Sequence, residues 1–133
     1  MSDVRENVER FLEQYQAALA NDDFETVAAS YHDTFLFGLP QHVHVVPAKN
    51  FALAAKRRQE FRGKGLSQTR LKQVEVTSID ANYIQARATF EMHIQDATRD
   101  VRATYIIFDD GARLRIVLQI DHQDLAQELS EQR

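Results

Sequence analysis

The sequence of 133 residues contains no cysteine, which excludes disulfide bonds, thiol catalysis and metal sites built from thiolates. Since a chain without cysteine suits a reducing compartment, we expect a cytoplasmic protein. No apolar run approaches the ~20 residues that a transmembrane helix requires, so membrane insertion is not expected. The charged start of the chain leads directly into a helical pattern, which is not typical of a secretory signal.

Positive charge is scarcer than negative charge, with 16 Lys and Arg residues against 20 Asp and Glu residues. This balance argues against nucleic-acid binding. The glycine-rich phosphate loops GxGxxG and GxxxxGK(S/T) and the serine elbow GxSxG do not occur. His42 and His44 have a spacing that suits zinc or iron. No HExxH or two-His-one-carboxylate pattern accompanies them, so neither a metal nor a cofactor is expected.

The composition, 44% apolar and 27% charged, is ordinary for a globular protein, and we expect one domain over residues 1–133. Apolar side chains recur at three- and four-residue steps over residues 3–20, which predicts an amphipathic helix on Val4, Val8, Phe11, Leu12, Tyr15 and Leu19. Asp22 stands three residues before Glu25, which is typical of a capping-box helix start. The apolar stripe of this second helix is Phe24, Val27, Ala28 and Tyr31.

The middle of the chain predicts a strand and a third helix, followed by a change of period. A short strand over residues 34–39 ends at Pro40, and Pro47 suits the first turn of the helix, which Gly63 and Gly65 end. A period of two then predicts four strands over residues 71–79, 83–95, 101–108 and 113–121. The expected fold class is α+β, with three N-terminal helices packed on a curved antiparallel sheet.

The last two predicted strands carry apolar side chains on both faces, over residues 105–108 and 114–120. Strands of this kind are usually covered on both sides. Three helices can cover one face only, so we expect the other face to meet a second copy of the chain in a homodimer.

The order helix, helix, short strand, helix and four antiparallel strands resembles the nuclear transport factor 2-like superfamily. Segments 13–24 and 28–37 look like its two-helix opening, and segments 114–117 and 121–125 look like its last strand and tail. The resemblance implies a cone with an internal pocket between the helices and the concave sheet, usually in a homodimer. Members include steroid isomerases, SnoaL-like cyclases, epoxide hydrolases, dehydratases and non-catalytic transport domains, so the resemblance does not determine the chemistry.

Steroid isomerases require a carboxylate base and an oxyanion hole made by a tyrosine and a protonated carboxylic acid. In the alignment that the resemblance suggests, Tyr15 falls on the tyrosine, Leu39 on the base and Ile106 on the acid. Leucine and isoleucine cannot transfer protons, so steroid isomerase activity is not expected. Tyr15 is also compatible with a packing role on a buried helix face.

Asp121, His122 and Asp124 form a polar cluster at the end of an apolar strand, and the resemblance places this end near the pocket. A carboxyl group in apolar surroundings suits acid–base chemistry near neutral pH; the alternative is a capped strand end with a solvated tail. Side chains two residues apart on a strand share a face. The alignment with the steroid isomerases turns Val117, Gln119 and Asp121 toward the pocket. It directs Leu114, Ile116, Leu118 and Ile120 toward the second chain of the expected homodimer. The opposite register, with these four in the core, is the alternative.

These observations favour a SnoaL-like pocket protein for a small apolar molecule. Its apolar wall would be formed by Tyr15, Phe61, Phe90 and Met92, and its polar contacts by Gln119, Asp121 and His122. For an enzyme, the sequence favours proton transfer on, or hydration of, an apolar substrate, with Asp121 as acid or base and Tyr15 as hydrogen-bond donor. The alternative is a non-catalytic dimeric interaction module whose cone is filled by its own side chains. An open cavity with an inward Asp121 would favour the first hypothesis.

Overall fold

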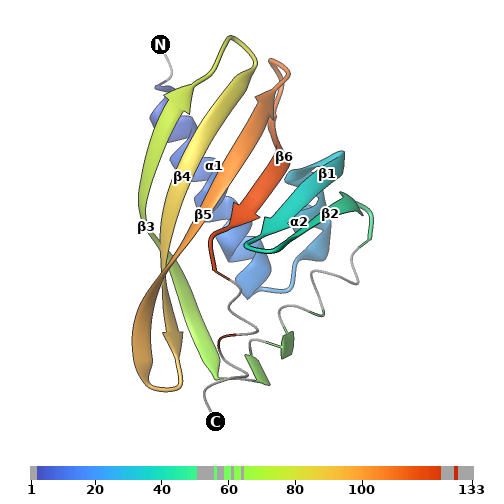
Figure 1. Cartoon of the computed structure of the whole chain (residues 1–133). Helices are drawn as coiled ribbons and strands as arrows, with labels where there is room; N and C mark the ends of the chain where they lie inside the picture. Colours follow the sequence, from blue (N-terminus) through green and yellow to red (C-terminus); the bar gives the residue numbers. More distant parts are fainter. Residues whose placement is uncertain are drawn as a thin grey trace.

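The computed structural model describes residues 3–50, 56, 59–60, 62–63, 65–123 and 128, and the fold is given for these residues. The elements with defined bounds are α1 (Val4–Ala20), α2 (Phe24–Ala29), β1 (Tyr31–Leu39), β2 (His42–Pro47), β3 (Leu66–Ser78), β4 (Tyr83–Ile94), β5 (Ala97–Asp109) and β6 (Leu114–Asp121). The helices pack on one face of a curved sheet (Figure 1), which confirms the predicted α+β class. Within the described residues, no helix is long and apolar enough to cross a membrane.

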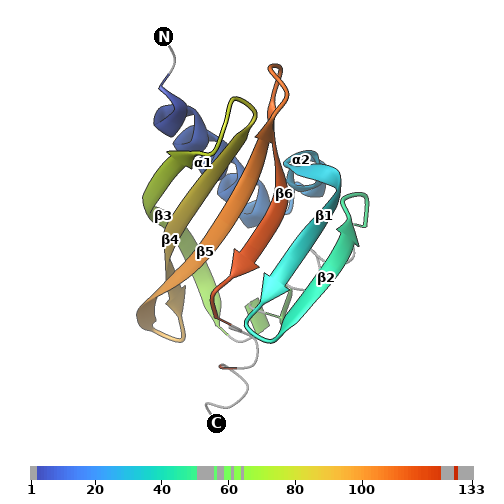
Figure 2. The same ribbon diagram turned by 45° about the horizontal axis from the view of Figure 1, so that its top comes forward.

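The six strands form one sheet in the order β2-β1-β6-β5-β4-β3. β1 runs parallel to β6, and the other neighbouring strands are antiparallel. In both ribbon views α1 lies behind β3, β4 and β5, while α2 lies close to β1 (Figures 1 and 2). The opposite face of the sheet carries no helix among the described residues.

The first helix follows the predicted apolar spacing. Its buried residues are Val8, Leu12, Tyr15 and Ala18, three or four residues apart, and they face the sheet. The side chain of Asp3 caps the helix by accepting a hydrogen bond of 2.9 Å from the backbone N–H of Arg5. This helix therefore carries Tyr15 on its buried face.

The second helix begins one residue later than the capping pattern predicted. Asp23, not Asp22, is the cap, and its carboxylate accepts from the backbone N–H and the hydroxyl of Thr26. Asp22 has a left-handed backbone (φ 56°) and pairs with Arg62 at 2.9 Å. Tyr31 was predicted to lie on the apolar stripe of this helix, and that prediction was wrong, because the helix ends at Ala29 and Tyr31 begins β1.

The third predicted helix is not supported at its start. Pro47 is the last residue of β2 and lies opposite Thr34 of β1. A proline is tolerated there because β2 is the edge strand of the sheet. Much of the remaining predicted helix, including Phe61, lies outside the described residues. Gly65 has the predicted left-handed backbone (φ 98°), and a Cβ at this position would lie 2.8 Å from Cγ of Gln95.

The hairpin between β4 and β5 is longer than predicted. A loop was expected over residues 96–100, but β5 already begins at Ala97. The turn consists of Gln95 and Asp96, both with positive φ (54° and 63°), which suits a two-residue hairpin. Asp100 pairs with Lys72 at 2.9 Å on the exposed side of this extension, so its polar residues belong to strands.

A bulge in β6 changes which side chains face the helices. Ile106 lies opposite Leu118, whereas the adjacent Ile107 lies opposite Ile116, so Val117 is an extra residue in the ladder. Ile116 is fully buried in the core, and Gln119 is buried too. The prediction that Ile116 faces outward was therefore wrong, while Gln119 has the predicted inward orientation.

The outer face of the sheet carries a row of aligned apolar side chains. Val45, Leu36, Leu118 and Ile106 are successive cross-strand partners on β2, β1, β6 and β5. We call these four residues the outer row. Val45 and Leu36 are 69% and 42% exposed, and the neighbouring Val43 is 68% exposed.

Candidate functional site

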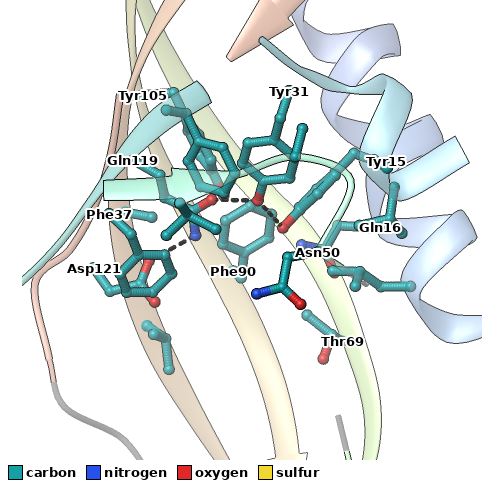
Figure 3. Close-up of a pocket in the computed structure, with 18 of the residues that line it drawn as sticks. Tyr15, Gln16, Tyr31, Phe37, Asn50, Thr69, Phe90, Tyr105, Gln119 and Asp121 are labelled. Carbon is teal, nitrogen blue, oxygen red and sulfur yellow. Dashed lines mark hydrogen bonds between the residues drawn. The ribbon is translucent and has the colours of Figure 1, made fainter. Parts of the chain in front are cut away.

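A cavity of about 150 Å³ lies between the helices and the concave face of the sheet. It opens among α1, α2, the β1–β2 hairpin and the inward side chains of β3 to β6 (Figure 3). Much of its wall is apolar, with Phe35, Phe37, Phe90, Met92, Val101 and Ala103 among the contributors. Polar side chains also reach it, namely Tyr15, Gln16, Tyr31, Asn50, Thr69, Tyr105, Gln119 and Asp121.

Four of these polar residues form one hydrogen-bonded network on the cavity wall. The hydroxyl oxygens of Tyr15 and Tyr31 are 2.6 Å apart. The hydroxyl of Tyr31 donates to Oε1 of Gln119 at 2.6 Å, and Nε2 of Gln119 donates to Oδ1 of Asp121 at 3.0 Å (Figure 3). We call Tyr15, Tyr31, Gln119 and Asp121 the Tyr–Gln–Asp network.

The donors and acceptors of this network follow from the number of hydrogens available. A tyrosine hydroxyl has one hydrogen, and that of Tyr31 is used toward Gln119. The short contact between the two hydroxyls therefore requires Tyr15 to be the donor and Tyr31 the acceptor. The three hydrogen bonds of the network therefore run in one direction, from Tyr15 through Tyr31 and Gln119 to Asp121.

Tyr31 is held in its protonated form by its surroundings. Burial raises the pKa of its hydroxyl well above the ordinary tyrosine value, and the neighbouring Tyr15 and Tyr105 add to this shift. Its ring also stacks on Phe35, with centroids 4.0 Å apart. Tyr31 is therefore a fixed neutral donor at the centre of the network.

The bulge in β6 is what brings Gln119 and Asp121 to the cavity. Both side chains lie beyond Val117 and face inward, opposite Tyr105 and Ala103 of β5. Ile116, before the bulge, fills the core. One strand thus supplies packing at its first half and polar groups at its second half.

A further polar atom on the wall is Oγ1 of Thr69, which is buried and has no hydrogen-bond partner among the described residues. A buried hydroxyl without a partner costs roughly 1–3 kcal/mol. Thr69 lies on β3, across the cavity from β6. This hydroxyl is therefore a polar group, separate from the Tyr–Gln–Asp network, that a molecule in the cavity can contact.

The structure places the sequence-predicted site residues unevenly. Tyr15, Phe90, Met92, Gln119 and Asp121 all line the cavity, and Phe61 lies outside the described residues. His122 is exposed, and its Nε2 is 2.7 Å from the hydroxyl of Thr104, on the outward side of β5. His122 is therefore away from the site predicted for it.

Two important cavity residues were not predicted. Tyr31 was assigned to the stripe of a helix that ends before it, and Tyr105 was read as part of an apolar strand that is covered on both faces. Strict alternation along β5 was the available signal for Tyr105, because Ala103, Tyr105 and Ile107 share the buried face. No sequence signal pairs Tyr31 with Gln119, 88 positions away.

The positions aligned with the steroid isomerase acid and base do not meet at the cavity. Leu39 packs against the core at the end of β1, and Ile106 belongs to the outer row. Neither is among the described residues that line the cavity.

The imidazole rings of His42 and His44 stack with centroids 6.2 Å apart on β2. In the described part of the chain, no group of three or more His, Asp or Glu side chains has the geometry to hold a metal ion. The polar groups of the described cavity wall are hydroxyls, amides and a carboxylate.

Comparison with known proteins gives a family and a fold. The family model described as NTF2-like protein (DUF6841) matches residues 2–124. No curated protein matches the sequence.

Several solved structures are similar to this chain over nearly its whole length. Aln2 from a Streptomyces species is 17% identical with a TM-score of 0.72, and the match covers 100% of this chain and 98% of Aln2. An NTF-2 like protein of unknown function from Shewanella oneidensis is 9% identical with a TM-score of 0.71, covering 90% and 98%. An NTF2-like protein with a cystatin-like fold from Novosphingobium aromaticivorans is 15% identical with a TM-score of 0.69, covering 94% and 87%. At these identities the similarity concerns the fold alone.

Proposed function

This chain belongs to the NTF2-like family (DUF6841), and from that premise we propose that it binds a small, largely apolar molecule in the cavity, as a pocket protein of the SnoaL-like type. The observation that carries the proposal is an apolar cavity of about 150 Å³ whose polar wall groups form the Tyr–Gln–Asp network. Binding sites for small molecules generally combine an apolar lining with a few placed polar groups.

The alternative of a cone filled by its own side chains has less support. Ala103 and Ala28 lie on the cavity wall, where larger side chains would occupy the space. Protein interiors are otherwise close-packed, with few voids larger than a water molecule. The cavity therefore favours a binding function over a purely structural module.

For a bound molecule that reacts, we propose proton transfer or hydration with Asp121 as the acid or base. Asp121 is the carboxyl group among the described lining residues, and Gln119 holds one of its oxygens at 3.0 Å. A positioned carboxylate within hydrogen-bond reach of a substrate can transfer a proton in this way.

We also propose that the outer row meets a second copy of the chain in a homodimer. Val45 and Leu36 are substantially exposed, and they continue the apolar line of Leu118 and Ile106. Burying such a row of apolar side chains against a partner chain removes it from water and stabilises the complex. A stable dimer typically buries about 1,200 Å² or more in total.

Binding in the cavity is tested by filling it. Ala103→Leu adds three carbons to the wall of the cavity, whereas Ala97→Leu adds them to an exposed position at the start of the same strand. Benzene is titrated into each protein, and amide chemical shifts are followed by NMR. We expect saturable shifts at Phe90, Ala103 and Gln119 in the wild type and in Ala97→Leu, and none in Ala103→Leu. Absence of saturable shifts in the wild type, or equal binding by Ala103→Leu, would contradict the proposal.

A further inference from the structure

Two bulges in β3 turn Thr69 toward the cavity. Ser67 and Lys72 are extra residues in the pairing of β3 with β4. Leu66 and Val74 both face inward, since the first lines the cavity and the second is buried in the core. Strict alternation from either residue would place Thr69, an odd number of positions away, on the outer face. The two bulges reverse the alternation between them, so Thr69 lines the cavity.

The hydroxyl of Thr69 contributes no hydrogen bond to the described fold. Its Oγ1 is buried and has no partner among the described residues, and a buried hydroxyl of this kind lowers stability. Valine has the same branched shape, with a methyl group in place of the hydroxyl, and it suits a strand equally well. It would fill this position without an unsatisfied oxygen. A molecule in the cavity can supply the partner that the described residues do not.

No hydrogen bond from the described residues holds this hydroxyl in its buried direction. A threonine side chain occupies staggered positions about its Cα–Cβ bond, and rotation between them exchanges the places of Oγ1 and the methyl group. Oγ1 can therefore turn toward a bound molecule at the cost of a rotamer change, without breaking a hydrogen bond to the described residues.

Thr69 lies in a different part of the cavity from the Tyr–Gln–Asp network. β4 and β5 separate β3 from β6 in the sheet, and Figure 3 shows Thr69 on the side of the cavity away from Asp121. Its partner on β4 is Met92, which packs against a small apolar cluster at the start of β3. Thr69 thus presents a hydroxyl beside an apolar surface.

We propose that Thr69 is a ligand-binding residue whose hydroxyl forms a hydrogen bond with a hydroxyl or carbonyl group of the bound molecule. The proposal rests on the binding function proposed above. It narrows the ligand to a small molecule with an apolar body and such an oxygen on the side that meets β3. A one-ring body fits, because an engineered cavity of about 150 Å³ in another protein binds benzene and this cavity has about the same volume. Bulges often re-aim side chains beside functional sites, which agrees with this assignment.

The test is a double-mutant cycle in which the protein and the ligand each lose one hydroxyl. Phenol and toluene differ by a hydroxyl in place of a methyl group, and so do the wild-type protein and Thr69→Val. The dissociation constants of both probes are measured by NMR titration or calorimetry. We expect the ratio of the phenol constant to the toluene constant to rise roughly three- to tenfold in Thr69→Val, because one net hydrogen bond is lost. Comparing ratios cancels the different hydration of the two probes.

Matched variants separate the hydroxyl from the packing of the side chain. Thr69→Ser keeps the hydroxyl and loses the methyl group, so it should keep the wild-type ratio even where both probes bind more weakly. Thr77→Val makes the same change as Thr69→Val at an exposed position of β3 and should leave both constants unchanged. Without a probe, Thr69→Val should unfold at a higher urea concentration than the wild type, since it removes an unsatisfied buried hydroxyl.

The outcomes distinguish this role of Thr69 from the proposed binding function. If both probes bind the wild type and the ratio is the same in Thr69→Val, Thr69 is not the contact and the cavity still binds small molecules. A lower urea midpoint for Thr69→Val than for the wild type would show that the hydroxyl already has a partner in the free protein, which would overturn the assignment. If neither probe binds the wild type, the binding function and the role of Thr69 fail together.

Discussion

Replacing Tyr31 by phenylalanine removes one hydroxyl group from the centre of the Tyr–Gln–Asp network and leaves the ring in place. That hydroxyl accepts from Tyr15 and donates to Gln119, with both contacts at 2.6 Å. A hydrogen bond in a folded protein contributes about 1 kcal/mol net, so the two bonds contribute about 2 kcal/mol. The substitution also leaves Tyr15 and Oε1 of Gln119 without this partner, which adds to the loss, while water entering the cavity offsets a part of it.

We therefore expect Tyr31→Phe to lower the free energy of unfolding by about 2–3 kcal/mol. With an unfolding entropy of about 2.1 cal/mol/K per residue, this corresponds to a fall in Tm of about 7–11 °C for 133 residues. The assay is urea denaturation followed by circular dichroism, with a thermal scan at the same protein concentration because association would shift Tm.

The matched control is Tyr83→Phe, which removes the same atom from a tyrosine that is partly exposed at the start of β4. Substitutions at such surface positions usually change stability by less than about 0.5 kcal/mol. Equal stability losses for the two variants, or a loss below about 0.5 kcal/mol for Tyr31→Phe, would show that the network is not formed in solution.

Three other outcomes follow from the structure. Phe90 is 3% exposed and borders the cavity, so Phe90→Ala should lower the free energy of unfolding, measured by urea denaturation, by about 3–4 kcal/mol. A loss below about 1 kcal/mol would mean that Phe90 is assigned to the wrong face of β4. Because the pKa of Tyr31 is raised in the folded state, the unfolded chain releases this proton first, near pH ~10. Stability should therefore fall as the pH rises above that value, and Tyr31→Phe should flatten the fall. Leu36→Lys places a charge in the outer row and should convert the proposed dimer to a folded monomer, as measured by sedimentation at micromolar protein concentration. Thr77→Lys, at an exposed position of β3, should leave the dimer intact. A monomeric wild-type protein would refute the proposed dimer.

The parts of the fold that the sequence predicts well are those with an uninterrupted period. The stripe of α1 and the alternation of β4 both lie where apolar residues recur over three or more turns or pairs, and the structure confirms both. The family resemblance was also confirmed, because it rested on the order of such elements. Errors occurred at boundaries, where one residue type suits two structures. Pro47 can begin a helix or end an edge strand, and only the pairing with β1 decides between them.

The candidate site was harder to predict because its polar groups come from distant segments. Tyr15, Tyr31 and Gln119 lie on α1, β1 and β6, and their contacts depend on β1 running parallel to β6 in the middle of the sheet. The resemblance to the superfamily predicted Tyr15, Gln119 and Asp121 at a pocket. It missed Tyr31, the residue that connects them, since a tyrosine at the end of a helical stripe also fits that stripe.

The bulge at Val117 explains why the sequence supported two opposite registers for the last strand. A strict alternation must place Ile116 and Leu118 on the same face, and either face was a reasonable choice. The extra residue removes this constraint: Ile116 enters the core, Leu118 joins the outer row, and Gln119 turns to the cavity. Each register was therefore right for one half of β6. A bulge has no reliable signature when the residue that bulges is a valine among other apolar residues, so the orientation of Gln119 and Asp121 depends on the pairing with β5 and not on the local sequence.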